Sequence, residues 1–73
     1  MKQTIEALKG HIESFGYYKE IKLIEKSEDA IFFAAIDLDG DEVFIKAEID
    51  DGLNFDEWNL WECYDNSHWS PVD

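Results

Sequence analysis

Positive charge is scarce in this chain of 73 residues, which has no arginine and six lysines against eighteen aspartates and glutamates. The formal net charge is −12 at pH 7. Binding to nucleic acid needs basic groups that displace counterions from phosphates, so this balance argues against a direct nucleic-acid ligand. The partners of the chain are instead expected to be basic.

Cysteine and long apolar runs are also scarce. The single cysteine, Cys63, cannot form an internal disulfide, and the N-terminal residues lack the basic and then apolar blocks of a secretory signal. The longest apolar run, residues 30–36, has seven residues, whereas a membrane-spanning helix needs about twenty. We therefore expect a cytoplasmic protein that does not bind membranes.

The chain does contain enough apolar material to fold. Hydrophobic residues make up 45% of it and aromatic residues 15%, which is too much for a disordered acidic tail. The length corresponds to one domain, residues 1–73. A core of this size rarely supplies more than about 3–5 kcal/mol of stability, so little room remains for a lined catalytic cavity.

The first segment carries the pattern of an amphipathic helix. Thr4 is expected to cap its start, because a threonine hydroxyl can accept an unpaired backbone N–H of the first turn. Gly16 stands where helices commonly end in a left-handed residue. The apolar residues at helical spacing are Ile5, Leu8, Ile12 and Phe15.

Between residues 17 and 49 the apolar period shortens to two, which is typical of β-strands. We expect three strands, at residues 17–26, 30–38 and 41–49. Asp39 and Gly40 join the second and third strands, and Asp-Gly between alternating apolar runs strongly predicts a two-residue hairpin turn. The second strand is apolar on both sides, so it should lie inside the sheet.

A two-residue turn also sets the expected register of this hairpin. It places Leu38 opposite Asp41 and gives an apolar face on which the helix should pack. On the other face, Asp37 stands opposite Glu42 as a pair of like charges. The remaining pairs expected on the apolar face are Ile36 with Val43, Ala34 with Ile45, Phe32 with Ala47, and Ala30 with Ile49.

Residues 50–73 give a weaker pattern. Asn54 and Glu57 have the spacing of a capping box, which indicates one helical turn. A fourth strand then fits better than a longer helix, with Glu62 as the one polar residue on its apolar side and Pro71 in an irregular tail. The overall expectation is an α+β fold, with one N-terminal amphipathic helix packed on a three- to four-stranded antiparallel sheet. The apolar side of the fourth strand is expected to present Trp58, Leu60 and Tyr64.

A calcium-binding loop is one interpretation of the hairpin turn. The sixth position of such a loop needs glycine for its sharp turn, and here it is Glu42. The hairpin would also separate the first and last ligands by about six residues, or roughly 20 Å. A turn with solvated carboxylates is therefore favoured, and we expect no bound metal or cofactor. The acids at positions one, three, five and twelve are Asp37, Asp39, Asp41 and Glu48.

Catalytic groups are equally sparse. His11, Cys63 and His68 are the only soft metal ligands. Cys63 and His68 are five residues apart, but two ligands do not make a structural zinc site, which takes four. Paired carboxylates carry no signal for acid–base catalysis, because eighteen acids in 73 residues pair by chance. We therefore expect no enzyme activity and no catalytic residues.

The negative charge is concentrated in the second half of the chain. Residues 1–36 hold six acids and five lysines, whereas residues 37–73 hold twelve acids and one lysine. The two halves therefore carry net charges of −1 and −11. Solubility explains a charged surface in general, but its confinement to one half of the chain argues equally for a functional acidic surface.

The leading hypothesis is a small intracellular interaction protein that occupies the basic, nucleic-acid-binding surface of a partner protein. It would act as a DNA or RNA mimic and inhibitor, with carboxylates that steer the encounter and pair with lysine and arginine. In size and charge, the chain resembles the small acidic inhibitors that phages and mobile elements make against host nucleases and repair enzymes. It would itself be a monomer or a small homo-oligomer. The residues expected to bind the partner are Asp37, Asp39, Asp41, Glu42, Glu48, Asp50, Asp51, Asp56 and Glu57.

The alternative is an accessory or subunit module with an apolar interface. The three tryptophans, Trp58, Trp61 and Trp69, would either cover the second face of the sheet or anchor a partner. In this interpretation acidity only maintains solubility, and the interface is an aromatic face that bears Phe33, Phe44 and the tryptophans. Such a complex would tolerate salt, whereas a complex held by exposed charges would not.

Overall fold

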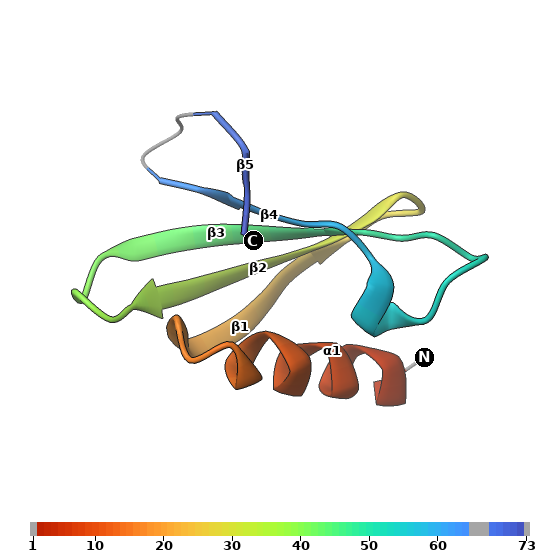
Figure 1. The fold of residues 1–73 in the computed structure, drawn as a ribbon, viewed down its shortest axis with the longest axis horizontal. Coiled ribbons are helices and arrows are strands. Elements are labelled where there is room, and N and C mark those ends of the chain that lie inside the picture. Colours follow the sequence, from red (N-terminus) through yellow and green to blue (C-terminus); the bar gives the residue numbers. More distant parts are fainter. Residues whose placement is uncertain (1, 65–67, 73) are drawn as a thin grey trace.

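The computed structural model describes residues 2–64 and 68–72. Figure 1 follows the chain from the N-terminal helix through the strands in sequence order. The elements are α1 (Lys2–Ser14), β1 (Tyr18–Lys26), β2 (Ala30–Asp37), β3 (Glu42–Glu48), the short 3₁₀ helix η1 (Phe55–Glu57), β4 (Leu60–Cys63) and β5 (Ser70–Pro71).

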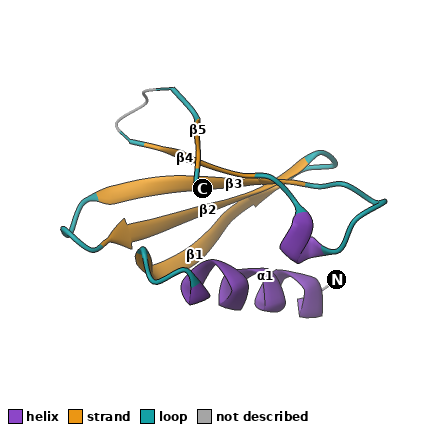
Figure 2. Ribbon diagram, in the orientation of Figure 1, coloured by secondary structure: helices purple, strands orange, loops and turns teal. Residues whose placement is uncertain are grey.

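The five strands form one antiparallel sheet in the order β1-β2-β3-β4-β5, so each strand pairs with its neighbour in sequence. α1 packs on one face of this sheet (Figure 2). The predicted α+β fold of one helix on an antiparallel sheet is confirmed. The prediction of three to four strands is one short, because Ser70 and Pro71 pair with β4 where an irregular tail was expected.

The end of α1 agrees with the sequence, and its start does not. The N–H of Gly16 donates to the carbonyl of Glu13 at 3.0 Å, and Gly16 has a φ of 77°, a left-handed conformation that glycine adopts without a Cβ clash. α1 begins at Lys2, so Thr4 lies within the helix and not at its cap.

β1 departs from the regular alternation of its sequence. Its pairing with β2 shifts between Lys19 and Lys22 and shifts again after Leu23. Glu20, at the first shift, has a φ of 53°, as expected where a bulge inserts an extra residue. Ile21 is buried, but Leu23 is 43% exposed, so the second half of β1 contributes little to the core.

The β2–β3 hairpin has a different register from the predicted one. The N–H of Asp37 donates to the carbonyl of Asp41 at 2.9 Å, which leaves a three-residue loop of Leu38, Asp39 and Gly40. The predicted opposition of Leu38 and Asp41 is therefore wrong, and so is every facing pair derived from it. The pairs on the helix side of the sheet are Ile31 with Ala47, Phe33 with Ile45, and Ala35 with Val43.

The side chain of Asp37 explains the longer turn. Its Oδ1 atom accepts the N–H of Asp39 at 2.9 Å and the N–H of Asp41 at 2.8 Å, and aspartate commonly stabilises turns in this way. Gly40 has a φ of 89°, the left-handed residue that completes a three-residue hairpin loop. Leu38 consequently lies at the end of the hairpin, where it is 72% exposed.

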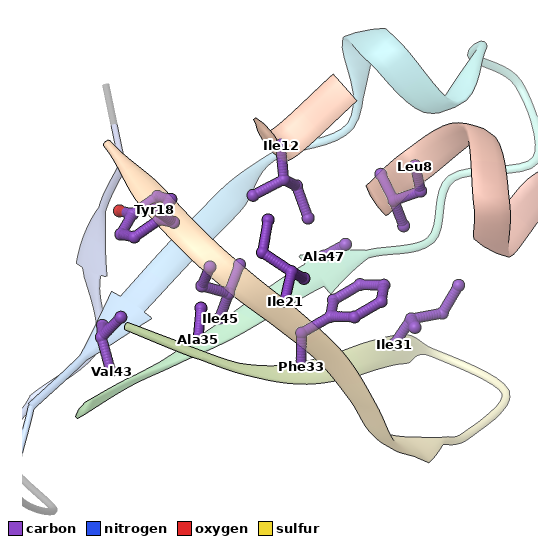
Figure 3. Close-up of a cluster of buried hydrophobic side chains, with 10 residues drawn as sticks. All are labelled: Leu8, Ile12, Tyr18, Ile21, Ile31, Phe33, Ala35, Val43, Ile45 and Ala47. Carbon is purple, nitrogen blue, oxygen red and sulfur yellow. The ribbon is translucent and has the colours of Figure 1, made fainter. Parts of the chain in front are cut away.

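The core lies between α1 and the inner side of β1, β2 and β3 (Figure 3). Leu8 and Ile12 of α1 are fully buried, as are Phe33 and Ile45 of the central strands. Complete burial of a side chain of this size contributes about 1.5–3 kcal/mol. The contacts between α1 and the sheet therefore contribute several kcal/mol to a domain whose core rarely supplies more than about 3–5 kcal/mol in total.

The predicted helical turn and fourth strand are both present. Glu57 Oε1 accepts the N–H of Asn54 at 3.2 Å, and the N–H of Glu57 donates to the Asn54 carbonyl at 2.8 Å, so the pair closes η1. Leu60 in β4 packs against the core. Glu62 shares the inner side of β4, and the Tyr18 hydroxyl donates a hydrogen bond to it. This bond explains the polar residue on an otherwise apolar side.

Candidate functional site

The nine acidic residues predicted to bind a partner lie at opposite ends of the β2–β3 hairpin (Figure 1). Glu42 and Glu48, the members of the two groups that lie at the ends of β3, are six residues apart, or roughly 20 Å. The molecule is 33 Å in its longest dimension, so each group lies near one end of it. We call the first group the hairpin tip; it comprises Asp37, Asp39, Asp41 and Glu42. The other five residues are Glu48, Asp50, Asp51, Asp56 and Glu57.

At the hairpin tip, Asp37 is bound into the fold. In addition to its two backbone donors, its Oδ2 atom accepts the Tyr64 hydroxyl at 3.0 Å. Hydrogen bonds from the backbone of Asp41, then from Tyr64 and the backbone of Asp39, hold the pKa of the Asp37 carboxyl below its usual value. The predicted like-charge pair does not form, because Glu42 stands opposite Ile36.

Two tyrosine hydroxyls reach carboxylates at this end of the sheet. Tyr18, which pairs with Asp37 in the ladder, is 6% exposed and donates to Glu62. Burial, followed by this hydrogen bond, raises the pKa of Tyr18 well above its ordinary value. Burial and the bond to Asp37 raise the pKa of Tyr64 to about 12. Both tyrosines therefore act as hydrogen-bond donors at neutral pH.

Three carboxylates of the tip also lie close to one another. Oxygen atoms of Asp37, Asp39 and Asp41 all lie within 4.8 Å, the one group of three or more metal-ligating side chains in residues 2–64 and 68–72. The fourth ligand of the calcium-loop interpretation, Glu48, stands opposite Ala30 at the other end of the hairpin. The turn thus has the geometry of a hairpin loop and not that of a calcium loop.

The second group is larger than the sequence analysis indicates. The β1–β2 turn brings Glu28 and Asp29 to the same end of the sheet, where the N–H of Ile49 donates to the Asp29 carbonyl at 2.9 Å. An antiparallel meander always places its first turn beside the end of its third strand, so topology could have indicated this neighbourhood. We call the full group the acidic end; it comprises Glu28, Asp29, Glu48, Asp50, Asp51, Asp56 and Glu57, all exposed.

Backbone hydrogen bonds hold the loops of the acidic end in place. Ser27 Oγ accepts the N–H of Ala30 at 3.1 Å, and the N–H of Ser27 donates to the Ala30 carbonyl at 2.8 Å, which closes the β1–β2 turn. Asp50 Oδ1 accepts the N–H of Gly52 at 3.0 Å. The Trp58 indole donates to the Asp50 carbonyl at 2.9 Å, which ties this loop to the segment after η1.

A groove of about 670 Å³ opens at the acidic end. Its floor is apolar, because α1, β2 and the segments that flank η1 each contribute a large side chain. Acidic residues from the β1–β2 turn and the β3–η1 loop stand at its rim beside Lys26. The floor comprises Ile5, Ile31, Ile49 and Trp58, and the acidic rim residues are Glu28 and Asp51.

The outer face of the sheet, opposite α1, carries aromatic side chains. Lys46 Nζ lies 4.9 Å from the ring centroid of Trp69 and 5.9 Å from that of Trp61, which is the geometry of a cation–π contact. Trp69 also lies 6.2 Å from Phe32, centroid to centroid. The prediction that Phe33 contributes to this face is wrong, because the corrected register buries it completely on the helix side.

The histidine and cysteine side chains that could bind a soft metal ion, His11, Cys63 and His68, lie in different parts of the structure. His11 packs edge-on against Phe15, with 4.9 Å between ring centroids. Cys63 is buried on β4, opposite Phe44. His68 is exposed. The structure does not bring these three side chains together as a cluster of ligands in the part of the chain that it describes.

No protein family, curated protein or solved structure matches this chain. None of the helices in the described ranges has the length and apolar character to cross a membrane. Function must therefore be inferred from the acidic end, the groove and the outer face themselves.

Proposed function

We propose that this chain is a small interaction protein that binds a basic, nucleic-acid-binding surface of a partner protein through its acidic end. Occupation of that surface would exclude DNA or RNA, so the chain would act as a competitive inhibitor in the cytoplasm. This is the mode of action expected of small acidic inhibitors from phages and mobile elements.

The observation that carries the proposal is the gathering of seven exposed carboxylates from two parts of the chain that are distant in sequence, the β1–β2 turn and the segment from the end of β3 through η1. Like charges repel, so the fold gains no stability from the mutual proximity of these carboxylates. The hydrogen bonds that Glu48, Asp50 and Glu57 accept explain those three positions individually but not the gathering of all seven. A surface that recognises lysine and arginine does gain, because its field steers a basic partner toward it. The hydrogen bonds that fix both loops keep this surface in one arrangement before binding.

The hairpin tip extends the same surface lengthwise. It adds four carboxylates, the nearest of them roughly 20 Å along β3 from the acidic end. A protein that binds DNA across one helical turn, about 34–36 Å, presents a basic surface long enough to contact both ends of this molecule. The acidic end is the primary contact, because Asp37 at the tip is already engaged by backbone and tyrosine donors.

The test is a capture experiment with matched charge reversals. The tagged protein is incubated with a lysate at 0.05, 0.15 and 0.5 M NaCl, and bound proteins are identified by mass spectrometry. A triple variant at the acidic end, Glu28→Lys with Asp51→Lys and Asp56→Lys, is compared with a triple variant at the tip, Asp39→Lys with Asp41→Lys and Glu42→Lys. All six residues are exposed, so both variants should remain folded.

We expect one partner to persist at 0.15 M NaCl, to be lost with the acidic-end variant and to be weakened with the tip variant. The purified partner should then release a labelled 20-base-pair duplex when the protein is added. Capture of many basic proteins that all elute together at modest salt would contradict the proposal, and so would simultaneous binding of duplex and protein to the partner.

The outer aromatic face supports a second candidate, a subunit module with an apolar interface. Ile24 is 54% exposed and Trp69 is 37% exposed, and both line a hollow with Phe32. This candidate predicts capture that survives 0.5 M NaCl and both charge variants but is lost in Trp69→Ala. The same experiment therefore distinguishes the two functions.

A further inference from the structure

The groove at the acidic end combines an apolar surface with an acidic one. Its floor consists of apolar side chains, and Glu28 and Asp51 stand on its rim. Its volume of about 670 Å³ falls in the range of 300–1,000 Å³ that is typical of ligand sites. A bound molecule would therefore meet hydrophobic contacts and negative charge within one site.

We propose that this groove binds a basic segment of the partner protein, with one or two large apolar side chains on the floor and lysine or arginine side chains at the rim. This inference rests on the proposed function, because it names the part of the acidic end that selects the partner. It adds an apolar anchor to what would otherwise be an interaction between exposed charges.

Charge complementarity identifies the occupant as basic. The two rim carboxylates, Glu28 and Asp51, belong to the seven carboxylates of the acidic end. Among the lining residues that the structure describes, the one positively charged side chain is Lys26. Attraction between opposite charges strengthens where water is partly excluded, as it would be once the apolar floor is covered. The groove thus offers an apolar anchor site with carboxylates beside it that can pair with lysine or arginine.

The same charge argues against a second copy of this chain as the occupant. Each copy carries −12, and an isologous contact through the groove would bring two acidic rims together. An apolar small molecule would use the floor and leave the rim without a role. A basic segment with an apolar anchor uses both.

Trp58 provides a reporter inside the groove. Its ring lines the floor, and its indole N–H donates to the carbonyl of Asp50 on the neighbouring loop. A ligand that covers the floor and engages the acidic loop will change the environment of this N–H. The indole resonance of Trp58 in a ¹H–¹⁵N spectrum should therefore shift when the groove is filled.

The test titrates the ¹⁵N-labelled full chain with two synthetic ten-residue peptides. Both contain four lysines, and one contains two leucines where the other contains two serines. We expect the leucine peptide to bind about tenfold more tightly or better, because burial of one leucine side chain is worth at least that factor. The shifts should centre on Ile49 and Trp58, and the preference for leucine should persist at 0.5 M NaCl.

Variants of Ile49 test the location. Ile49→Trp should fill the groove and reduce the preference for the leucine peptide to less than about twofold, whereas Leu38→Trp at the hairpin tip should leave it unchanged. Ile49→Ala cannot introduce a clash, so it keeps the test valid if the larger side chain prevents folding. It should reduce the preference by about threefold.

Equal affinity for the two peptides would overturn the proposal, and so would shifts centred on Phe32 and Trp69 of the outer face. The groove proposal would also be overturned if sedimentation showed that the wild-type protein is a dimer and that Ile49→Trp is a monomer. That result would mean that a second copy of the chain fills the groove. If the peptides bind equally but acidic-end charge reversal still abolishes partner capture, the groove proposal fails and the proposed function stands. If charge reversal leaves capture intact, the proposed function fails.

Discussion

At the hairpin tip, Asp37 accepts two backbone N–H groups and a tyrosine hydroxyl, whereas at the acidic end Glu28 and Asp51 are exposed on the rim of a groove. These carboxylates are therefore used in different ways. The fold supplies the hydrogen-bond donors for Asp37, whereas in the proposed complex the partner would supply the donors for Glu28 and Asp51. The other engaged carboxylates of the acidic end, Glu48, Asp50 and Glu57, each accept one hydrogen bond from the fold. Total charge alone cannot separate these roles, but the hydrogen-bond partners can.

The largest predicted effect is a loss of folding stability when Tyr18, near the hairpin tip, is replaced. Tyr18→Ala removes a ring that is 6% exposed, and a buried aromatic-to-alanine change costs about 3–5 kcal/mol. That loss equals the whole stability expected for a domain of this size, so the variant should be largely unfolded at 25 °C. Leu53→Ala in the β3–η1 loop, where Leu53 is 45% exposed, should unfold at nearly the wild-type urea concentration. Comparable losses of stability in Tyr18→Ala and Leu53→Ala would contradict the view that the tip end contributes more to the stability of the fold than the acidic end.

The hydroxyl of Tyr18 should matter less than its ring. Tyr18→Phe leaves the partly buried Glu62 without its donor and should lower the free energy of unfolding by about 1–3 kcal/mol at pH 7. Tyr64→Phe should cost less, because Asp37 retains its backbone donors. Urea unfolding followed by far-UV circular dichroism gives both values. A larger loss in Tyr64→Phe would reverse the assigned order.

The same tyrosines predict an alkaline limit to stability. Their pKa values are raised in the folded state, so their contribution is complete below the unfolded pKa of about 10 and declines as the pH rises toward the folded values. The free energy of unfolding should therefore fall above about pH 10, and the fall should be smaller in Tyr64→Phe. An identical alkaline profile in wild type and variant would contradict the assigned role of the Tyr64 hydroxyl.

Acid should act on the tip through Asp37. The folded pKa of this carboxyl is depressed, so its contribution is complete above the unfolded pKa of about 3.9 and is lost as the pH falls through the folded pKa. Asp37→Asn should therefore be less stable than wild type at pH 6, and the difference should shrink below about pH 4. Thermal unfolding across this pH range measures it. A difference that grows in acid would mean that the charge of Asp37 does not stabilise the turn.

The smallest predicted effect has the opposite sign and belongs to the acidic end. Asp51→Asn and Glu28→Gln each remove one charge from a crowded group, so each should raise the thermal midpoint slightly at low salt. The gain should shrink as the Debye length falls from about 30 Å at 0.01 M to about 8 Å at 0.15 M ionic strength. A lower midpoint in either variant would indicate that these carboxylates, like Asp37, support the fold.

The elements of the fold could be predicted because their patterns are local. The stripe of α1, the left-handed Gly16 and the turn closed by Asn54 and Glu57 each depend on residues within a few positions of one another. The register of the β2–β3 hairpin could not be predicted from such a local pattern. β2 is apolar on both sides, so shifting it by one residue leaves an apolar face in either case.

The register depends on the side chain of Asp37, which accepts the backbone N–H groups of Asp39 and Asp41. These hydrogen bonds favour a three-residue loop over the predicted two-residue loop. Only part of the candidate site can be found from the sequence, because its residues also come together through long-range pairing. Acidic residues in the second half of the chain were apparent from composition, but Glu28 and Asp29 join them only through strand order. The floor of the groove depends on three elements that meet in space, and no single stretch of sequence carries that pattern.

The outermost strands of the sheet limit how this protein can associate. β1 is distorted by two shifts in pairing, and β5 has only two residues, one of them Pro71, which has no N–H to donate. Neither edge presents the long, regular ladder of free backbone groups that an incoming strand would extend. Edge strands that are distorted or very short also disfavour edge-to-edge aggregation. In the proposed complex, side chains would therefore make the recognition contacts, and the specificity could be altered by substitution without rebuilding the sheet.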